Sequence, residues 1–342
     1  MAIDIFTTRY MMTVLEESFP PSSFMLDKFF TQTETSDQET AEFDVITDPQ
    51  TVAAPQGPKL PAQAVQAIGY KTKTTPRAYF SEKIACEAWD MMRNRLPGDN
   101  MYVEKSVLER ASVRMARDLD HLRRRLRRAY ELMAVEALTT GKLKVQGKGV
   151  NFEVDYEYDE KNIITLSGSA LWSATGAEVY GQLKDYAVDI QLRSGHNTDI
   201  IILGKEAAKL FIKNAEIKEY LNNRRYEMGQ IAPKRLPGGV SYIGSFPEFG
   251  DVYSYHWATM NSSGELVTAF PEYGCYMGCT DALNWRLYGP VPSFTAPRYT
   301  EEYPDVFEEK DPEMHWTRLR STFLPGLVQP KAGKFITVGS KA

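Results

Sequence analysis

Cysteine and histidine are the residue types in this sequence that most readily hold a metal ion or supply a nucleophile. Cys275 and Cys279 lie four positions apart in YGCYMGCTD. A structural zinc site needs a second ligand pair at short spacing, and the scattered histidines here do not provide one. We therefore interpret both cysteines as small buried residues of a strand. The other candidates are Cys86, His121, His196, His256 and His315.

The glycine-rich segment GKLKVQGKG invites comparison with a phosphate-binding loop, but its spacing is wrong. Five residues separate Gly141 from Gly147, where the motif has four, and Gly149 stands where Ser or Thr would hold the metal. A hairpin after a helix is the simpler interpretation. The sequence also contains no G-x-S-x-G and no H-E-x-x-H. We therefore expect no enzyme activity, no cofactor, and no catalytic or metal-binding residue.

The segment HLRRRLRRAY carries the strongest local charge. From Arg110 to Arg128 there are eight Arg and two Asp, a net charge of +6, and from Glu301 to Glu313 there are seven acids and one Lys, a net charge of -6. Arginine binds carboxylates and phosphates alike, so pairing with protein, binding of nucleic acid and a solvated face all stay open. We favour pairing between the two segments. The residues expected to meet are Arg123, Arg124, Arg127, Glu308, Glu309 and Asp311.

A long helix is predicted over residues 101–138, which contain the arginine run. Apolar residues recur there every three or four positions, neither Pro nor Gly interrupts them, and Gly141 follows as a stop. At 1.5 Å per residue such a helix is about 57 Å long. A helix of this length needs several packing partners. The apolar positions are Val107, Leu108, Ala111, Met115, Leu119, Leu122, Leu126, Ala129, Met133 and Ala137.

The segments around this helix differ in character. Residues 1–35 are too apolar to stay solvated and too short for a core, so we expect an arm that lies along another surface. Residues 32–81 contain five prolines and few large apolar side chains, which predicts a partly extended excursion. Residues 178–295 are expected to form a mixed α/β unit, with helices at 180–192 and 205–221, a buried strand at 199–203 and strands over 240–257.

Composition excludes several classes of protein. The 342 residues are 25% charged and 43% hydrophobic with a net charge of -5, as in ordinary globular proteins. No apolar stretch approaches the ~20 residues that cross a bilayer, so we expect no membrane contact. The N-terminal segment contains acidic residues and lacks the basic stretch followed by an apolar stretch that a signal peptide has. We therefore expect a cytosolic product without a signal peptide.

Several blocks together resemble the major capsid protein E family of lambda-type tailed phages. FTTRYMM and FMLDKFF, which ends in Phe29 and Phe30, resemble the amino-terminal arm of that family. GKLKVQGKGVNFEVDY resembles its Gly-Lys hairpin, and NIITLSGSALWS its Ser-Gly and Trp-Ser block. IKEYLNNRRY, VSYIG, the DPE tail, a later Ser-x-x-Leu-Pro and a final FITV follow in the same order.

The resemblance implies an α+β fold of the Hong Kong 97 type. Its expected parts are an N-terminal arm at 1–39, an extended loop (E-loop) at 40–85, a peripheral domain at 86–177 and 296–342 that contains the spine helix, and an axial domain at 178–295. The family's function would then be the icosahedral head shell of a tailed double-stranded DNA phage. The alternatives are a DNA-binding protein that uses the basic helix and, less favoured, a thiol-dependent enzyme.

Partners follow from the same resemblance. It implies hexamers and pentamers of this chain, a separate scaffolding protein, a portal, a decoration protein and non-specifically packaged DNA, without covalent cross-links. The protein would pass from the host cytoplasm into the virion. Suspected intersubunit contacts are Phe29, Phe30, Lys59, Tyr70, Arg123, Arg124, Arg127, Glu308, Glu309 and Asp311.

Overall fold

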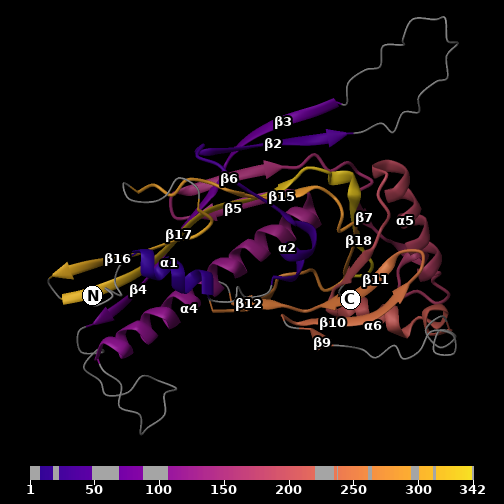
Figure 1. Cartoon of the computed structure of the whole chain (residues 1–342). Coiled ribbons are helices and arrows are strands. Elements are labelled where there is room, and N and C mark those ends of the chain that lie inside the picture. Colours follow the sequence, from indigo (N-terminus) through magenta and orange to yellow (C-terminus); the bar gives the residue numbers. More distant parts are fainter. Residues whose placement is uncertain are drawn as a thin grey trace, which may run out of the picture.

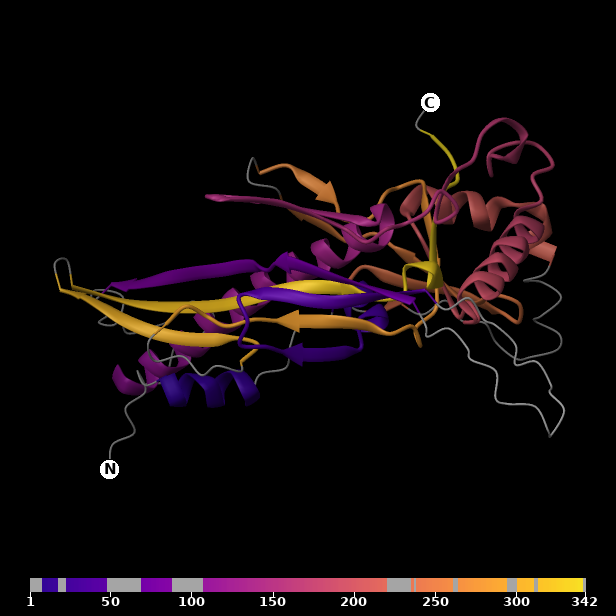
Figure 2. The same ribbon diagram turned by 90° about the horizontal axis from the view of Figure 1, so that it is seen from above.

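The computed structural model describes residues 8–17, 23–47, 69–87, 107–219, 235–236, 238–260, 264–293, 300–310 and 313–340. Two larger β-sheets lie one after the other along an elongated molecule (Figures 1 and 2). Long strands reach one end, and helices α5 (Val179–Ser194) and α6 (Lys205–Lys213) lie at the other. Among these residues, no helix is both long and apolar enough to span a membrane.

The first sheet is organised around β17 (Glu313–Leu327). Strands β16 (Tyr303–Lys310) and β4 (Ala78–Glu87) pair antiparallel with the first part of β17, and β15 (Asn284–Tyr288) pairs with its last five residues. Strand β1 (Gln32–Thr35) adds to β15 in parallel. These strands come from distant parts of the sequence, so long-range packing must specify their order.

Helix α4 (Val107–Thr140) lies against β17. Its 34 residues span about 51 Å. After Thr140 the chain turns at Gly141, which has a φ of +66° and donates its N–H to the Ala137 carbonyl at 3.0 Å. The predicted long helix and its stop are confirmed, and residues 101–106 lie outside the described part. The buried stripe contains Ala111, Met115, Leu119, Leu122, Leu126, Met133 and Ala137.

The second sheet contains seven strands within the described residues. Its central strand β8 (Ile200–Leu203) is fully buried, and α5 and α6 pack their apolar sides in the same core. The sheet takes two strands from outside the expected range 178–295, whereas β15 from inside that range joins the first sheet. In spatial order the strands are β7 (Ile163–Thr165), β18 (Gly333–Thr337), β14 (Gly274–Gly278), β8, β11 (Gly250–Tyr255), β10 (Val240–Phe246) and β9 (Arg235–Leu236).

The helix predicted over 205–221 is interrupted, so that prediction was wrong in its extent. Helix α6 ends at Lys213, and residues 215–219 are again helical. The side-chain oxygen of Asn214 accepts hydrogen bonds from the N–H groups of Glu216 (3.0 Å) and Ile217 (3.3 Å). Asparagine thus caps a new helical turn instead of continuing the first helix.

Three hairpins and two short helices complete the described structure. The hairpins are β2 (Thr40–Thr47) with β3 (Gly69–Pro76), β5 (Lys142–Gly147) with β6 (Val150–Asp155), and β12 (Ala258–Met260) with β13 (Leu266–Thr268). Helices α1 (Thr8–Glu17) and α2 (Phe24–Phe29) lie against α4, and single 3₁₀ turns occur at Gly168–Ala170 and Pro330–Ala332. Within the expected extended loop, β2, β3 and β4 are paired strands, and residues 48–68 are outside the described part.

Candidate assembly interface

Arg123 joins three parts of the chain on the basic side of α4. Its Nε lies 2.9 Å from a carboxylate oxygen of Glu302, and its Nη1 donates a hydrogen bond to the Leu15 carbonyl of α1 at 2.8 Å. The side chains of Arg123 and Glu302 are only 13% and 7% exposed. The basic and acidic segments therefore meet within one chain, at a buried ion pair.

Glu302 also faces a second arginine of α4. Arg127 Nε lies 3.8 Å from the other carboxylate oxygen, and its side chain is nearly buried. Burial raises the pKa of the Glu302 carboxyl above its ordinary value, although both guanidinium groups oppose this shift. Removing the carboxylate would leave two poorly hydrated cations side by side, so the cluster is sensitive to loss of one member.

The other arginines of the run lie closer to the surface. Arg124 pairs with Asp120 one helical turn earlier. Arg125 donates two hydrogen bonds to Glu82 of β4, at 2.6 and 2.8 Å. These side chains are about half exposed, so we expect each pair to contribute less than about 1 kcal/mol to stability.

Two acidic residues of β16 contact their own hairpin rather than α4. Glu308 lies 3.6 Å from Nδ1 of His315, and Glu309 accepts a hydrogen bond from the indole N–H of Trp316 at 2.9 Å. Both acidic residues are exposed. Within one chain, their expected contact with the arginines of α4 does not form, because antiparallel pairing places them across from β17.

Glu131 links α4 to two other parts of the subunit. Its Oε1 accepts hydrogen bonds from the Met25 N–H and the Tyr255 hydroxyl, both at 2.8 Å, and its Oε2 accepts one from the Leu26 N–H at 2.9 Å. Glu131 is 2% exposed, and burial raises the pKa of its carboxyl despite these donors. The sequence does not single out this residue, because its only signal is an acid beside the apolar stripe.

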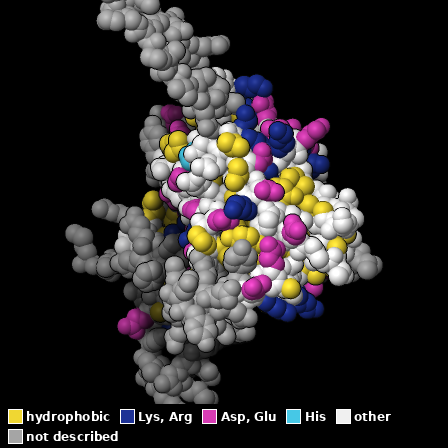
Figure 3. Space-filling view, turned by 90° about the vertical axis from the view of Figure 1, so that its right-hand side faces the viewer, with side chains coloured by type: hydrophobic (Ala, Val, Ile, Leu, Met, Phe, Trp, Pro, Cys, Tyr) yellow, Lys and Arg dark blue, Asp and Glu magenta, His cyan; other side chains and the backbone are white. Residues whose placement is uncertain are grey.

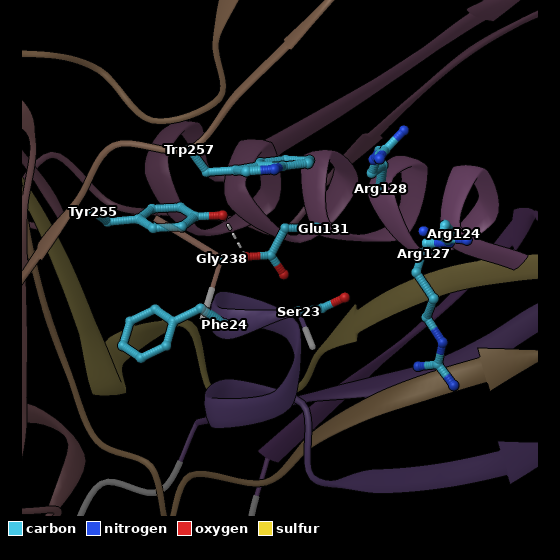
Figure 4. A pocket seen from close by; sticks show the side chains of 9 residues that line it. All are labelled: Ser23, Phe24, Arg124, Arg127, Arg128, Glu131, Gly238, Tyr255 and Trp257. Atoms are coloured by element: carbon cyan, nitrogen blue, oxygen red, sulfur yellow. Dashed lines mark hydrogen bonds between the residues drawn. The ribbon is translucent and has the colours of Figure 1, made fainter. Parts of the chain in front are cut away.

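A small cavity of about 100 Å³ opens beside this carboxylate. In Figure 4, Tyr255 points its hydroxyl at Glu131, and the side chains of Trp257 and Arg128 lie in the upper half of the view. Arg124 and Arg128 are exposed, whereas Arg127 is buried. The cavity thus combines an aromatic wall with exposed positive charge. Its lining comprises Ser23, Phe24, Arg124, Arg127, Arg128, Glu131, Gly238, Tyr255 and Trp257.

Comparison with known proteins identifies the chain. Residues 7–338 match the family model described as phage major capsid protein E. The chain belongs to this family. It is 24% identical over 348 residues to the major capsid protein of Escherichia phage lambda, and the match covers 98% of this chain and 99% of that protein.

Solved capsid structures confirm the Hong Kong 97-type α+β fold of this capsid subunit. The putative capsid protein of an E. coli CFT073 prophage has a TM-score of 0.74 at 16% identity, over 99% of this chain and 100% of that one. A chain from the asymmetric unit of the bacteriophage PhiM1 mature capsid has a TM-score of 0.53 at 10% identity, over 95% of this chain and 90% of that one. The capsid of cyanophage P-SCSP1u has a TM-score of 0.51 at 9% identity, also over 95% and 90%.

The remaining expected contact residues of the capsid subunit fall into three groups. Phe29 and Phe30 are 1% and 0% exposed in the subunit's own core, where Phe29 packs edge-on against Tyr276 with ring centroids 5.1 Å apart. They are therefore not surface contacts in this conformation, because the arm buries them against its own chain. Tyr70 is 66% exposed on β3. Lys59 and Asp311 lie outside the described residues.

The cysteines of the capsid subunit are poorly placed for chemistry. Burial raises the pKa of the Cys279 thiol to about 12, and it raises that of Cys275 still further. Thiolates react and thiols do not, so neither side chain is an activated nucleophile. Among the described residues, no group of His, Cys, Asp and Glu is arranged to hold a metal ion.

Proposed function

We propose that this capsid subunit assembles, through rings of five and six copies, into the icosahedral head shell of a tailed double-stranded DNA phage. The family match over residues 7–338 is the observation that carries this proposal. The role is structural and non-catalytic, and it places the protein in the host cytoplasm first and in the virion after assembly. The exposed apolar surface described below supports a chain that functions in contact with other copies.

We propose that the two larger sheets belong to different domains of the subunit. We assign the β17-centred sheet with α4 to a peripheral domain and the β8-centred sheet with α5 and α6 to an axial domain, with the N-terminal segment as an arm and β2 and β3 as the base of an extended loop. Figure 3 looks onto the axial end, where hydrophobic side chains are exposed between charged ones. Val188 and Leu192 of α5 and Ile212 of α6 are 45%, 73% and 45% exposed. In a ring, these residues would face other copies near the axis.

Charged residues supply a second proposed contact between copies. Glu308 and Glu309 are exposed on β16, near one end of the molecule, and Arg124 is exposed on α4. Opposite charges across an interface guide orientation and register more than they raise affinity. We propose that the acidic end of β16 in one subunit approaches the basic side of α4 in another.

The shell would also need other molecules. We propose a separate scaffolding protein, a portal and a decoration protein, together with packaged DNA that is held non-specifically. Arg124 and Arg128 offer exposed guanidinium groups for weak, salt-sensitive contact with phosphates. The same residues support the second candidate function, a DNA-binding protein, which would instead bind DNA tightly as a small soluble species.

Charge reversal tests the proposed function. In particles formed by co-expression with the scaffolding protein, Glu308→Lys with Glu309→Lys should strongly reduce assembly, while the isolated subunit unfolds at the same denaturant concentration as wild type. Reversal of Arg124 to Glu in the same chain should restore particles. Intact assembly of the double reversal with unchanged salt dependence would contradict this contact.

A matched variant separates assembly from folding. Glu302→Lys places a cation in the buried arginine cluster, so it should destabilise the isolated subunit itself. If Glu302→Lys and the β16 reversals behave alike in both assays, the distinction between an internal ion pair and an intersubunit contact is wrong.

A further inference from the structure

The β2–β3 hairpin lies on the rest of the subunit by one of its two faces. Phe43 and Val45 of β2 are 6% and 4% exposed, and the ring of Phe43 packs against that of Tyr156 with centroids 5.8 Å apart. Lys73 and Lys71 of β3 are directly paired with Phe43 and Val45, so their side chains lie on this same face. Figure 1 shows the hairpin along the upper edge of the view, next to β6. Both lysines therefore face the segment that follows β6.

Glu157 in that segment receives both lysines. Its Oε2 accepts a hydrogen bond from Lys71 Nζ at 3.0 Å, and its Oε1 lies 3.1 Å from Lys73 Nζ. Lys73 Nζ also donates a hydrogen bond to the carbonyl oxygen of Asp155 at 2.6 Å. Hydrogen bonds from Lys71 and then Lys73 hold the pKa of the Glu157 carboxyl below its ordinary value, so this group is charged at neutral pH. Among the described residues, every hydrogen bond and ion pair that β3 makes outside its own hairpin ends on Asp155 or Glu157.

The backbone of Glu157 has an unfavourable conformation. Its φ is +58°, and no other residue except glycine has a positive φ in the described part of the chain. The N–H of Glu157 donates a hydrogen bond to Oδ1 of Asp155 at 2.8 Å, which helps to hold this conformation. Glutamate enters the left-handed region only at a cost in free energy, and such residues persist where surrounding contacts hold them, often in segments that switch. The two ion pairs of Glu157 are contacts of that kind.

We propose that Glu157 is an electrostatic latch that holds β3 against its own subunit and opens when the ion pairs with Lys71 and Lys73 are weakened. The side chains of Lys71 and Glu157 are 73% and 37% exposed, whereas that of Lys73 is 22% exposed. Ion pairs this accessible to water contribute little each and are screened by salt, so small changes shift the balance between closed and open states. Because the latch acts within one chain, it goes beyond the proposed shell function and does not depend on it.

The other strand of the hairpin defines the motion. Strand β2 stays in place when the latch opens, because Phe43 and Val45 are buried and the Ile46 N–H donates a hydrogen bond to the Val328 carbonyl at 3.0 Å. The hairpin therefore rolls about β2, and β3 moves away from Glu157. In the free subunit, the latch thus sets the position of β3 before any other copy is present.

Distances between two spin labels on the unassembled subunit test the latch. One label is attached at Tyr70→Cys, which is exposed on β3, and the other at Lys161→Cys, in an exposed turn outside the hairpin. The three native cysteines are buried and do not compete for the label. At about 0.01 M salt, where the Debye length is about 30 Å, the labelled subunit with Glu157 intact should give one narrow distance distribution. At about 1 M salt, where that length is about 3 Å, a second population at longer distance should appear.

Glu157→Gln removes the charge and leaves the length of the side chain unchanged. At low salt this variant should raise the ratio of open to closed subunits by about two- to thirtyfold, as the loss of two partly exposed ion pairs allows, and salt should then change the ratio little. Glu153→Gln is the matched control. Glu153 also lies near two lysines, Lys142 at 3.8 Å and Lys144 at 3.7 Å, but all three belong to the β5–β6 hairpin.

The control should behave like the labelled subunit with every native carboxylate intact. Three results would overturn the proposal: distances that Glu157→Gln leaves unchanged, a salt response that persists without the Glu157 carboxylate, or an equal effect of Glu153→Gln. All these measurements use the unassembled subunit, so their outcome is independent of whether particles form.

A second substitution at the same position separates the latch from the backbone strain. Glu157→Asn loses the ion pairs as Glu157→Gln does, but asparagine adopts the left-handed region more readily. Glu157→Asn should therefore open the hairpin to a similar extent and yet unfold at a higher urea concentration than Glu157→Gln. An equal or lower urea midpoint for Glu157→Asn would contradict a strained Glu157, and a hairpin that stays closed in this variant would contradict the latch.

Discussion

Glu131→Gln is the substitution that most directly tests how the subunit is held together. The wild-type carboxylate accepts three hydrogen bonds from buried donors on α2 and β11, at 2.8 to 2.9 Å. Glutamine has nearly the same shape but only one acceptor oxygen. With that oxygen at the Oε1 position, the Met25 and Tyr255 bonds survive, and the amide nitrogen faces the Leu26 N–H, another donor.

The expected cost follows from these contacts. A buried N–H that loses its acceptor costs about 1–3 kcal/mol, and each of the two surviving bonds weakens by about 1 kcal/mol when its acceptor loses charge. Relief of the desolvation that raises the carboxyl pKa offsets part of this loss. We therefore expect Glu131→Gln to lower the free energy of unfolding by about 2–4 kcal/mol at neutral pH.

Urea unfolding of the unassembled subunit measures this change. The matched variant Tyr255→Phe removes one donor and leaves both backbone N–H groups in place, so it should cost about 1–2 kcal/mol. The double variant should cost less than the sum, because both changes act on the same carboxyl group. A loss below about 0.5 kcal/mol for Glu131→Gln would refute the reasoning, since buried donors would then not depend on the carboxylate.

The pH dependence of the same variant has a definite sign. Burial raises the folded-state pKa of Glu131 above its ordinary value of 4.5, so the folded protein binds the proton more tightly than the unfolded chain does. The contribution of Glu131 to stability is then fully present below pH 4.5 and falls as pH rises through the folded pKa. The stability difference between wild type and Glu131→Gln should therefore shrink from acid to neutral pH. A difference that grows over this range would contradict the assigned pKa direction.

Three further predictions concern other parts of the subunit. Gly141→Ala should lower the free energy of unfolding by about 2–5 kcal/mol, because the residue has a φ of +66° and a Cβ would lie 2.4 Å from a tyrosine ring. Gly149→Ala has a φ of +77° but open space around it, so it should cost only about 1–2 kcal/mol in urea unfolding. Glu302→Gln should destabilise the subunit by about 2–4 kcal/mol, whereas Glu309→Gln should cost less than about 0.5 kcal/mol. Equal losses would mean that the burial of Glu302 beside Arg123 and Arg127 does not affect stability. The three buried cysteines should react with a thiol reagent only after unfolding, so rapid labelling of the native subunit would disprove their burial.

Local patterns were sufficient for the features that depend on neighbouring residues in the sequence. The three-and-four spacing of apolar residues predicted α4, and Gly141 predicted its end. The opposite charges of the two segments predicted their meeting, but not that Glu302 would be the acid involved. Which acid reaches the helix depends on the register of β16 against β17, and local charge counts carry no information about register.

Features set by long-range packing were not predictable in this way. The aromatic pair at Phe29 and Phe30 has the composition of a contact surface, yet both rings are buried in the subunit, because α2 folds back against α4 and β14. The Glu131 junction was missed for the same reason. Its donors come from residues more than a hundred positions away in the sequence.

Electron microscopy of the purified protein, after co-expression with the proposed scaffolding protein, tests most directly whether this chain builds a head shell. We expect closed shells of uniform diameter whose boiled protein runs mainly as a 38.8 kDa band, because we expect the subunits to be held without covalent cross-links. We also expect the unassembled subunit to bind DNA only weakly and to lose that binding as salt rises. A soluble monomer or dimer that forms no shells and binds DNA with nanomolar affinity would contradict the role as a shell subunit.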